Sequence, residues 1–421
     1  MPNSRRSDSV PPASPSLSPE LVALLRRITD AGGQPMLVGG WVRDRLLGIH
    51  SKDKDIEVFH LPFSDLKNLC RRHGRVFTVG AAFAVLKVTL RDGETVDISI
   101  PRREYHIGEG HRGFDVHADP AMSIAAAAER RDLTVNAISM DPFTFEPIDP
   151  TGGMVDLAER RLRHVGPRFR EDPLRVLRVY QFQARLAFTI APETRALCRE
   201  ISAAGMLLTL PRERIEEELK KFFLRGQPDW IDVALRHARQ DGVIAAVLPE
   251  LATLGSVPQD PRYHAEGDVL EHTIRAVAEA AASARRAGLD DLNRWILCLA
   301  ALTHDLGKAV VTRSTPGGIV SYGHDKAGEE PARALLERIT GQVKVIDHVL
   351  ALVRTHMRPL MLAQAKTVSD TAIRRLATAV QPSSIDMLCY LTEADTAASV
   401  RGDGTEPVNA HVFLRERAEA V

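Results

Sequence analysis

The sequence has few cysteines, the residues that cross-link small secreted proteins through disulfides or bind zinc in zinc knuckles. It has four cysteines among 421 residues, and aromatic residues make up only 5%. The cysteines are widely separated, and three of them fall in apolar helical patterns, which is typical of reduced core thiols and excludes a disulfide framework or a zinc knuckle. They are Cys70, Cys198, Cys298 and Cys389. We therefore expect a cytoplasmic protein.

Long apolar runs and net charge are also lacking. No stretch of about twenty apolar residues occurs, so no segment is expected to span a membrane. The first residues, MPNSRR, have no apolar core and lead into a Pro- and Ser-rich stretch, which predicts a disordered tail rather than a secretory signal over residues 1–19. The 55 basic and 55 acidic residues cancel. A nucleic-acid partner would therefore have to be bound by a local basic surface.

A glycine turn stands near the start of the chain, which is long enough for two or three domains. Apolar residues 35–38 predict a short buried strand that ends at Gly39 and Gly40. Glycine lets the backbone approach a phosphate closely and leaves amides free to bind it. The apolar spacing of residues 41–47 predicts a helix, so the glycines stand where a helix N-terminus would face an anion.

Three carboxylates follow the glycine turn. Asp53 and Asp55 are two residues apart in a segment that becomes β-like at residues 56–59, so they share a face suited to magnesium. Asp97 falls on the second strand of a hairpin predicted over residues 84–90 and 94–100, which an Asp-Gly turn joins. Taken singly, these residues also fit a solvated loop and an exposed strand position. Together with the glycine turn they indicate nucleotidyl transfer.

Two further stretches carry polar groups toward the same region. Residues 102–114 are rich in glycine and charge and are predicted to form an irregular, functional loop. These glycines do not predict a dinucleotide site, because no strand–helix unit flanks them. Residues 130–136, RRDLTVN, can bind phosphate and ribose hydroxyls, or else cap the alanine-rich helix before them.

An arginine-rich segment at residues 160–178 leads into a helical region that extends to about residue 251. The helix begins at the sequence EDPLR, where Pro173 suits the first turn and Asp172 fits an N-cap. The alternative is that Asp172 and Arg175, three residues apart on one helical face, present an acceptor and donors to the edge of a nucleobase.

Histidines and aspartates dominate the last third of the chain. The adjacent pair His304-Asp305 follows an apolar helix and precedes Leu-Gly-Lys. An imidazole and a carboxylate side by side are ligands for a divalent metal, and outlying His and Asp residues can complete the shell. The candidates are His272, His304, Asp305 and Asp395, with His324 and His356 for a second ion. His348 has no evident partner and is expected to be structural.

In this order and combination, the motifs resemble the class II CCA-adding tRNA nucleotidyltransferases and bacterial poly(A) polymerases, which belong to the polymerase-β-like superfamily, followed by an HD phosphohydrolase domain. The resemblance extends from about Leu37 to Asp395. It implies an α+β fold, with a mixed-sheet nucleotidyltransferase head, an all-helical neck and a helical HD body. The predicted parts are a tail at residues 1–19, a head at 20–158, a nucleotide-selecting neck at 159–250 and an HD domain at 251–421.

The resemblance also implies roles for the site residues. Asp53 and Asp55 would hold Mg²⁺, and Asp97 would act as a third carboxylate or base. The nucleotide would be bound by Gly39, Gly40, Arg43, Arg130, Asp132, Asn136, Asp172, Arg175 and Arg178. A flexible loop containing Gly108, Gly110, Arg112 and Gly113 would change the choice of nucleotide. The HD site would hold nickel, manganese, cobalt or zinc.

The expected reaction is template-independent addition of CMP, CMP and AMP, from CTP and ATP, to the 3′ end of tRNA. The HD body would act on RNA 3′ ends as a phosphohydrolase, or serve only as a scaffold. A poly(A) polymerase and an enzyme that adds only CC or only A remain alternatives within the class. An alternative from another class is a metal phosphohydrolase whose head only binds RNA. The presence of both Asp53 and Asp55 argues against this alternative.

Overall fold

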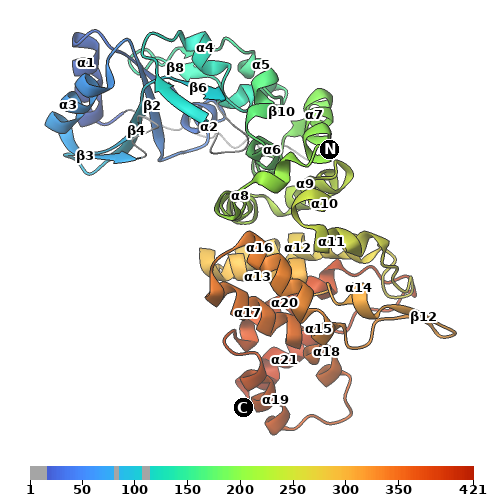
Figure 1. Ribbon diagram of the computed structural model, residues 1–421. Coiled ribbons are helices and arrows are strands. Elements are labelled where there is room, and N and C mark those ends of the chain that lie inside the picture. Colours follow the sequence, from blue (N-terminus) through green and yellow to red (C-terminus); the bar gives the residue numbers. More distant parts are fainter. Residues whose placement is uncertain (1–16, 80–84, 107–113) are drawn as a thin grey trace, which may run out of the picture. The chain divides into compact units, whose positions relative to one another are not determined.

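The computed structural model describes residues 17–79, 85–106 and 114–421. The chain divides into two compact units, Met1–Asp172 and Pro173–Val421. The first is drawn from blue to green and the second from green to red in Figure 1. Of the predicted parts, the HD domain and nearly all of the neck fall in the second unit, and the finer boundaries stay predictions. The predicted tail lies almost entirely outside the described residues.

The first unit is built on a seven-stranded mixed sheet with the strand order β3-β4-β5-β2-β1-β8-β9. Strands β2 and β5 run parallel, and β1 pairs antiparallel with β2 and β8. The elements up to β5 are α1 (Pro19–Asp30), β1 (Gln34–Val38), α2 (Gly40–Leu46), β2 (Lys54–Phe59), α3 (Phe63–His73), β3 (Gly74–Val79), β4 (Val85–Leu90) and β5 (Thr95–Ser99). After the β6–β7 hairpin, described below, come α4 (Ile124–Ala128), η2 (Thr134–Asn136), β8 (Ser139–Met140), β9 (Pro147–Ile148), α5 (Gly153–Ala158), β10 (Arg161–Leu162) and η3 (Pro167–Glu171).

The predicted hairpin at the centre of this sheet is confirmed. Strands β4 and β5 pair antiparallel, and the turn between them contains Gly93 with a positive φ of 87°. Alternation places Val96 and Ile98 in the core, at 1% and 0% exposure, and turns Asp97 to the opposite face. The period-2 pattern of the sequence therefore identified both the strand and the face that carries the carboxylate.

The prediction of an irregular loop over residues 102–114 is wrong at both ends of that range. Strands β6 (Arg102–His106) and β7 (Phe114–Ala118) form an antiparallel two-stranded ribbon. A ribbon outside the main sheet does not need one buried face, so its polar sequence lacks the apolar alternation that marks a sheet strand. The loop residues Gly108, Gly110, Arg112 and Gly113 lie outside the described residues.

The second unit is helical except for short strands. Its neck region has α6 (Leu174–Leu186), β11 (Thr189–Ile190), α7 (Pro192–Ala203), η4 (Met206–Thr209), α8 (Arg212–Arg225), α9 (Pro228–Gln240), α10 (Val243–Val247), α11 (Pro249–Thr253) and η5 (Leu254–Ser256). The rest has α12 (Val269–Arg286), α13 (Asp291–Thr303), α14 (Lys308–Val311), β12 (Arg313–Thr315), β13 (Gly318–Val320), α15 (His324–Ala327), α16 (Glu329–Ile339), α17 (Val343–Thr355), α18 (Arg358–Ala363), α19 (Asp370–Ala379), α20 (Ile385–Ala398) and α21 (Ala410–Glu419).

Helix α13 forms the centre of this unit. Its residues 295–303 are all buried, and it packs against α12, α17 and α20, as Figure 1 shows. Two of these neighbours, α12 and α20, begin at side-chain caps. Asp268 accepts from the Glu271 amide at the start of α12, and Ser384 accepts from the Met387 amide at the start of α20. An apolar helix enclosed in this way holds the residues at its C-terminal end, His304 and Asp305, deep in the unit.

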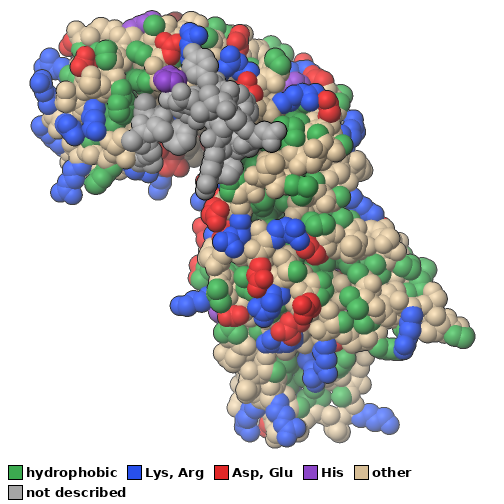
Figure 2. Space-filling model, viewed as in Figure 1, with side chains coloured by type: hydrophobic (Ala, Val, Ile, Leu, Met, Phe, Trp, Pro, Cys, Tyr) green, Lys and Arg blue, Asp and Glu red, His purple; other side chains and the backbone are tan. Residues whose placement is uncertain are grey.

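The surface agrees with a chain of zero net charge. On the face drawn in Figure 2, Lys and Arg side chains of the second unit are interspersed with Asp and Glu. Among the described residues, no helix is both long and apolar enough to cross a lipid bilayer.

Candidate functional site

The first unit brings the three predicted carboxylates together at the inner strands β2 and β5 of the sheet. Asp55 lies in β2 and is the register partner of Asp97 on the parallel strand β5. Asp53 comes directly before β2 and is exposed, whereas Asp55 is half-buried. Register partners on neighbouring parallel strands point to the same face. The arrangement is therefore an oxygen-rich cluster, open on one side to solvent.

The electrostatics of this cluster favour a cation. Burial raises the pKa of Asp55; the Arg131 guanidinium opposes this rise, and the carboxylates of Asp97 and Asp53 add to it. Carboxylates that raise one another's pKa repel when ionised, and a divalent ion between them removes that repulsion. Oxygen ligands in an open site suit Mg²⁺. These residues thus fit the predicted metal.

Gly39 sits against this cluster, and the backbone there requires glycine. Its φ is 72° and its ψ −138°, a conformation that side chains rarely adopt. A Cβ atom at Gly39 would lie 3.4 Å from Asp55 Oδ2 and 3.4 Å from Arg131 Nη1. Helix α2 starts at the next residue, Gly40. The predicted glycine turn and the carboxylates therefore belong to one site.

Arg43 is part of a buried network in the first unit. Its side chain is 1% exposed, and its guanidinium donates to Asp44 Oδ1 at 2.8 Å and to Asn136 Oδ1 at 2.5 Å. Asn136 in turn donates to Asp132 Oδ1 at 3.1 Å. These bonds hold α2 against the segment at residues 132–136. Arg43, Asp132 and Asn136 are thus placed as positioning residues, and their direct contact with a nucleotide stays a prediction.

Arg131 was missed as a site residue, since the prediction chose its neighbour Arg130. The Arg131 side chain is 30% exposed and lies 3.4 Å from Glu57 Oε2, on the strand that carries Asp55. It is also the cation that lowers the pKa of Asp55. The signal was the Arg-Arg pair itself. Which of two adjacent arginines faces the sheet depends on the turn after α4, which a local pattern does not specify.

The boundary between the two units falls within the predicted set of base-selecting residues. Asp172 ends the first unit, and Arg175 and Arg178 lie on α6 of the second. Helix α6 begins at Leu174 with Pro173 before it, so the N-cap position is one residue later than the one predicted for Asp172. Arg178 Nη1 lies 3.7 Å from Glu218 Oε1 on α8. Selection of a base by these residues stays a prediction.

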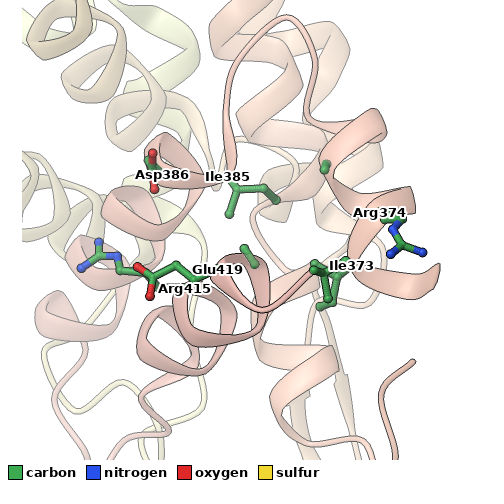
Figure 3. A pocket seen from close by; sticks show the side chains of 9 residues that line it. Ile373, Arg374, Ile385, Asp386, Arg415 and Glu419 are labelled. Atoms are coloured by element: carbon green, nitrogen blue, oxygen red, sulfur yellow. The ribbon is translucent and has the colours of Figure 1, made fainter. Parts of the chain in front are cut away.

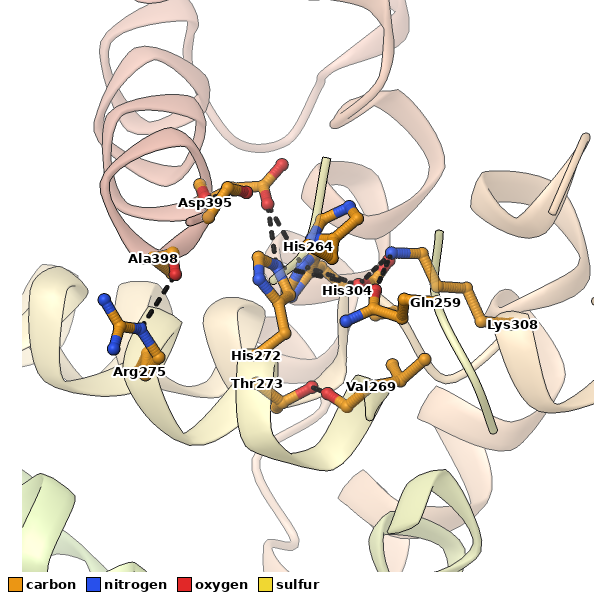
Figure 4. Close-up of polar contacts among 12 residues, drawn as sticks. Gln259, His264, Val269, His272, Thr273, Arg275, His304, Lys308, Asp395 and Ala398 are labelled. Atoms are coloured by element: carbon orange, nitrogen blue, oxygen red, sulfur yellow. Dashed lines mark hydrogen bonds and ion pairs between the residues drawn. The ribbon is translucent and has the colours of Figure 1, made fainter. Parts of the chain in front are cut away.

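The second unit gathers all six predicted metal ligands of the body in one place. They come from α12, the end of α13, α15, the end of α17 and α20, and they are His272, His304, Asp305, His324, His356 and Asp395. These six form two trios with ligand atoms within 4.8 Å of one another: His272, His304 and Asp395, and Asp305, His324 and His356. A third trio that meets the same criterion consists of His264, Glu266 and His272, of which only His272 was predicted. Figure 4 shows part of this cluster, with His272 and His304 beside Asp395.

Asp305 connects the two trios. Its Oδ2 lies 3.3 Å from His304 Nε2, and its Oδ1 lies 3.2 Å from His324 Nε2. His272 Nε2 is 2.9 Å from Asp395 Oδ1. A carboxylate that reaches histidines on both sides is placed to join two neighbouring ion positions.

The ring orientation of three histidines is fixed by hydrogen bonds from Nδ1 to the backbone. The Nδ1 atoms of His304, His324 and His356 lie 2.9, 2.8 and 2.7 Å from backbone carbonyl oxygens. A carbonyl only accepts, so each Nδ1 carries a hydrogen, and a neutral ring in this orientation has its lone pair on Nε2. The Nε2 atoms of His324 and His356 face each other at 3.0 Å. At this distance the two nitrogens either share one hydrogen or bind a metal ion together.

Charge in the cluster also calls for a cation. Burial alone would raise the pKa of Asp305 and Asp395, but the neighbouring histidines hold both well below the usual range. Burial lowers the pKa of His304, and the carboxylates of Asp305 and Asp395 outweigh it and raise that pKa to about 10. Burial and the nearby His324 and His304 lower the pKa of His356 to about 4. A mixed nitrogen and oxygen set of this kind suits a transition metal.

Three residues around this cluster were not predicted as site residues. Lys308 Nζ lies 2.7 Å from Asp305 Oδ2, and Glu266 contacts both His264 and His272. The sequence did mark both segments, one as the Leu-Gly-Lys flank and the other as the approach to the domain. A pocket among α19, α20 and α21, drawn in Figure 3, is lined by none of the predicted site residues.

Comparison with known families assigns a class to each part of the chain. Residues 36–163 match the poly A polymerase head domain, and residues 269–392 match the HD domain. Between them, residues 187–254 match the family described as the probable RNA and SrmB-binding site of polymerase A. The chain is thus a nucleotidyltransferase of the poly A polymerase head type joined to an HD domain.

The chain belongs to the family of the multifunctional CCA proteins. It is 38% identical over 365 residues to the multifunctional CCA protein of Xanthomonas campestris pv. campestris, covering 85% of this chain and 84% of that protein. It is 38% identical over 328 residues to the namesake from Alkalilimnicola ehrlichii, covering 76% and 73%. The family predicted from the motifs is confirmed.

Solved structures of lower identity share the fold. The Thermotoga maritima CCA-adding enzyme complexed with tRNA matches with a TM-score of 0.62 at 20% identity, covering 95% of this chain and 82% of that one. The Bacillus stearothermophilus CCA-adding enzyme in complex with CTP matches with a TM-score of 0.61 at 21% identity, covering 96% and 83%. The predicted α+β architecture is confirmed by these likenesses.

Proposed function

We propose that this protein adds CMP, CMP and AMP, taken from CTP and ATP, to the 3′ end of tRNA. The observation that carries the proposal is the cluster of Asp53, Asp55 and Asp97 beside the glycine turn at Gly39. The names of the relatives support the substrate, and CCA-adding enzymes with tRNA, ATP and CTP share the fold. The free thiols of all four cysteines fit the cytoplasmic location that we include in the proposal.

In the proposed reaction, the 3′-hydroxyl oxygen of the RNA attacks the α-phosphorus of CTP or ATP. A new bond forms between that oxygen and phosphorus, the bond to the oxygen that bridges to the β-phosphate breaks, and pyrophosphate leaves. Magnesium, when bound, would supply charge neutralisation and a lower pKa of the attacking hydroxyl. Asp53 and Asp55 would hold it, and Asp97 would add a third oxygen or accept the hydroxyl proton.

Other residues of the chain would hold and select the nucleotide. The backbone at Gly39 and Gly40, where α2 begins, would contact the triphosphate, while the buried Arg43 holds α2 in position. Arg130, with Asp132 and Asn136 close by, would face the ribose and phosphates. Asp172, Arg175 and Arg178 would present donors and acceptors to the base, and the loop with Gly108, Gly110, Arg112 and Gly113 would change the choice from cytidine to adenosine.

The test of this proposal is nucleotide addition to tRNA that lacks its 3′ end. CTP alone should extend the RNA by two residues, ATP alone by none, and both together by three, read as product length on a gel. Extension by two residues with both nucleotides would indicate a CC-adding enzyme, and a long ladder with ATP alone would indicate a poly(A) polymerase. No extension of any tRNA would contradict the assignment of the head.

We also propose that the body removes phosphate from RNA 3′ ends, including 2′,3′-cyclic ends. The carrying observation is the pair of ligand trios joined by Asp305, with the Nε2 atoms of His324 and His356 facing each other. Nickel, manganese, cobalt or zinc, when bound, would supply a nucleophilic water and polarise the phosphate. His272, His304, Asp305 and Asp395 would hold one ion, with His324 and His356 completing a second position that Asp305 shares.

The test of the body is hydrolysis of RNA that ends in a 3′-phosphate or a 2′,3′-cyclic phosphate, with nickel or manganese added. Wild type should release a 3′-hydroxyl end, and His304→Ala with Asp305→Ala should not. Equal hydrolysis by both proteins, or by neither, would assign the body a scaffold role.

A further inference from the structure

His272 differs from the other ligand histidines in the way its ring is held. His304, His324 and His356 stand at helix ends or starts, where a backbone carbonyl is available for Nδ1. His272 is the fourth residue of α12 and lies inside the helix. The carbonyl three residues before it, that of Val269, already accepts from the Thr273 hydroxyl at 2.8 Å. His272 therefore needs an acceptor from outside its own helix.

Glu266 provides that acceptor. Its side chain is 1% exposed, and its Oε1 lies 2.9 Å from His272 Nδ1. The same oxygen lies 2.8 Å from Nδ1 of His264, and Oε2 accepts the backbone N–H of Val400 at 2.8 Å. A buried carboxylate with three partners has one fixed position. Since that carboxylate only accepts, Nδ1 of His272 carries the hydrogen, and Nε2 is left to face Asp395 and the ion position.

The bond to Val400 extends this arrangement to a second ligand. Val400 follows α20, the helix that carries Asp395, and Ala265 also donates to the Val400 carbonyl at 2.8 Å. Glu266 therefore connects the segment before α12 to the segment after α20. His272 and Asp395, which lie 2.9 Å apart, come from these two helices. Figure 4 shows His264 close to both of them.

We propose that Glu266 is a positioning residue of the body's metal site, which fixes the ring orientation and the hydrogen position of His272 and presents its Nε2 to the metal. The inference depends on the metal centre of the proposed function. A carboxylate on the second nitrogen of a ligating histidine makes the ring a stronger donor, and removing such a group weakens metal affinity by about 10–100-fold.

The experiment measures metal affinity rather than turnover. Cobalt(II) is titrated into the full-length apo protein, and its visible absorption bands report occupancy and geometry. We expect Glu266→Ala to bind cobalt about 10–100-fold more weakly than wild type. Glu266→Gln keeps the volume and one acceptor oxygen but loses the charge, so its affinity should lie between the two. In a His272→Ala background, Glu266→Ala should cause no further loss, because the ring it positions is gone.

The matched control is Glu393→Ala. Glu393 also joins α12 to α20, through Ser283 at 3.0 Å and Arg286 at 2.8 Å, but its carboxylate bonds none of the ligands. If Glu266 only held the two helices together, both variants would weaken cobalt binding alike. Far-UV circular dichroism checks that each variant is folded, and Glu266→Gln decides the question if Glu266→Ala is not.

The outcomes separate this inference from the proposed function. Wild type that binds cobalt, with Glu266→Ala weakened and Glu393→Ala unchanged, supports the role of Glu266. Equal affinity in wild type and Glu266→Ala, or equal losses in the two glutamate variants, overturns it and leaves the metal centre in place. Wild type that takes up no cobalt overturns the metal centre and the inference together.

Discussion

The two candidate sites of this protein are built on opposite principles. In the head, the Asp97 side chain is 45% exposed and Asp53 is exposed, and the cluster holds oxygen ligands alone. In the body, Asp305 is 2% exposed, His272 is 0% exposed, and nitrogen and oxygen ligands alternate. An open carboxylate site can take its ion together with an incoming nucleotide and release it with the product. A buried set of histidine and aspartate ligands would release its ion more slowly.

The two sites also differ in which of their parts are held in place by the surrounding structure. In the head, Asp55 and Asp97 lie on strands, and Arg43 forms buried hydrogen bonds with Asp44 and Asn136. In the body, the ligands themselves are fixed, through carbonyls and through Glu266. In the head, the backbone is therefore the fixed part of the candidate site, and in the body the ligand side chains are. The predictions below test this difference, from the largest expected effect to the smallest.

The largest effect should follow from Asp55→Asn. A metal that neutralises charge in the transition state is worth several kcal/mol, so nucleotide addition should fall by roughly 10³-fold or more. Stability should not fall, because burial disfavours the charge that is removed. Single-turnover addition of CMP and thermal unfolding measure the two quantities. Asp92→Asn, on the exposed turn of the same sheet, is the control. Addition within tenfold of wild type would remove Asp55 from the catalytic centre.

The second prediction concerns metal removal. After chelation, magnesium should restore nucleotide addition but not phosphate hydrolysis, whereas nickel or manganese should restore hydrolysis, because oxygen sites and imidazole sites prefer different ions. His304→Ala should abolish the hydrolysis and leave addition unchanged. His348→Ala, on α17 outside both trios, serves as its control. If a single metal restored both activities equally, the prediction that the two sites prefer different metals would be wrong.

A smaller effect is expected from Arg175→Ala and Asp172→Ala. Loss of a hydrogen-bonded base edge should cost about 1–3 kcal/mol of discrimination, by analogy with direct base readout, while the rate of correct addition falls less. Competition of CTP and ATP against UTP and GTP measures the ratio. Variants that reject UTP and GTP as well as wild type does would show that these residues only shape the start of α6.

Much of both sites could be predicted from the sequence because their parts lie in short local patterns. Alternation in β5 identified the face of Asp97, and the Asp-Gly turn identified its hairpin. The six body ligands lie far apart in the chain, yet flanking residues marked His304-Asp305, and the family order supplied the others. Features that are encoded in a short stretch of sequence can be recognised without knowledge of the tertiary structure.

The residues that were missed depend on contacts between distant segments. Choosing Arg131 over Arg130 requires the turn after α4 and the position of Glu57 in space. The burial of Arg43 follows from Asn136, 93 residues away. Glu266 becomes relevant only because the Val269 carbonyl is occupied and His272 has no other acceptor. The strands β6 and β7 were missed for another reason, since a ribbon outside the main sheet lacks apolar alternation.

The smallest predicted effect tests whether the backbone of the head is part of its chemistry. Gly39 and Gly48 both have a φ near 70°, at 72° and 71°. An alanine at either position should cost about 1–3 kcal/mol of unfolding free energy, because the conformation disfavours a side chain. Only at Gly39 would the new Cβ meet Asp55 Oδ2, at 3.4 Å, whereas nothing lies within 4 Å at Gly48.

Gly39→Ala should therefore slow nucleotide addition by about tenfold beyond Gly48→Ala, because relief of the strained backbone at residue 39 would move a methyl group that is in van der Waals contact with Asp55. Hydrolysis by the body should be equal in both variants, since its ligands are fixed within their own unit. Urea unfolding and single-turnover addition of CMP, measured on the same preparations, give the two differences. Equal rates in the two variants would mean that the open head site tolerates movement of Asp55. Rigidity at the glycine turn would then not be required for the transfer.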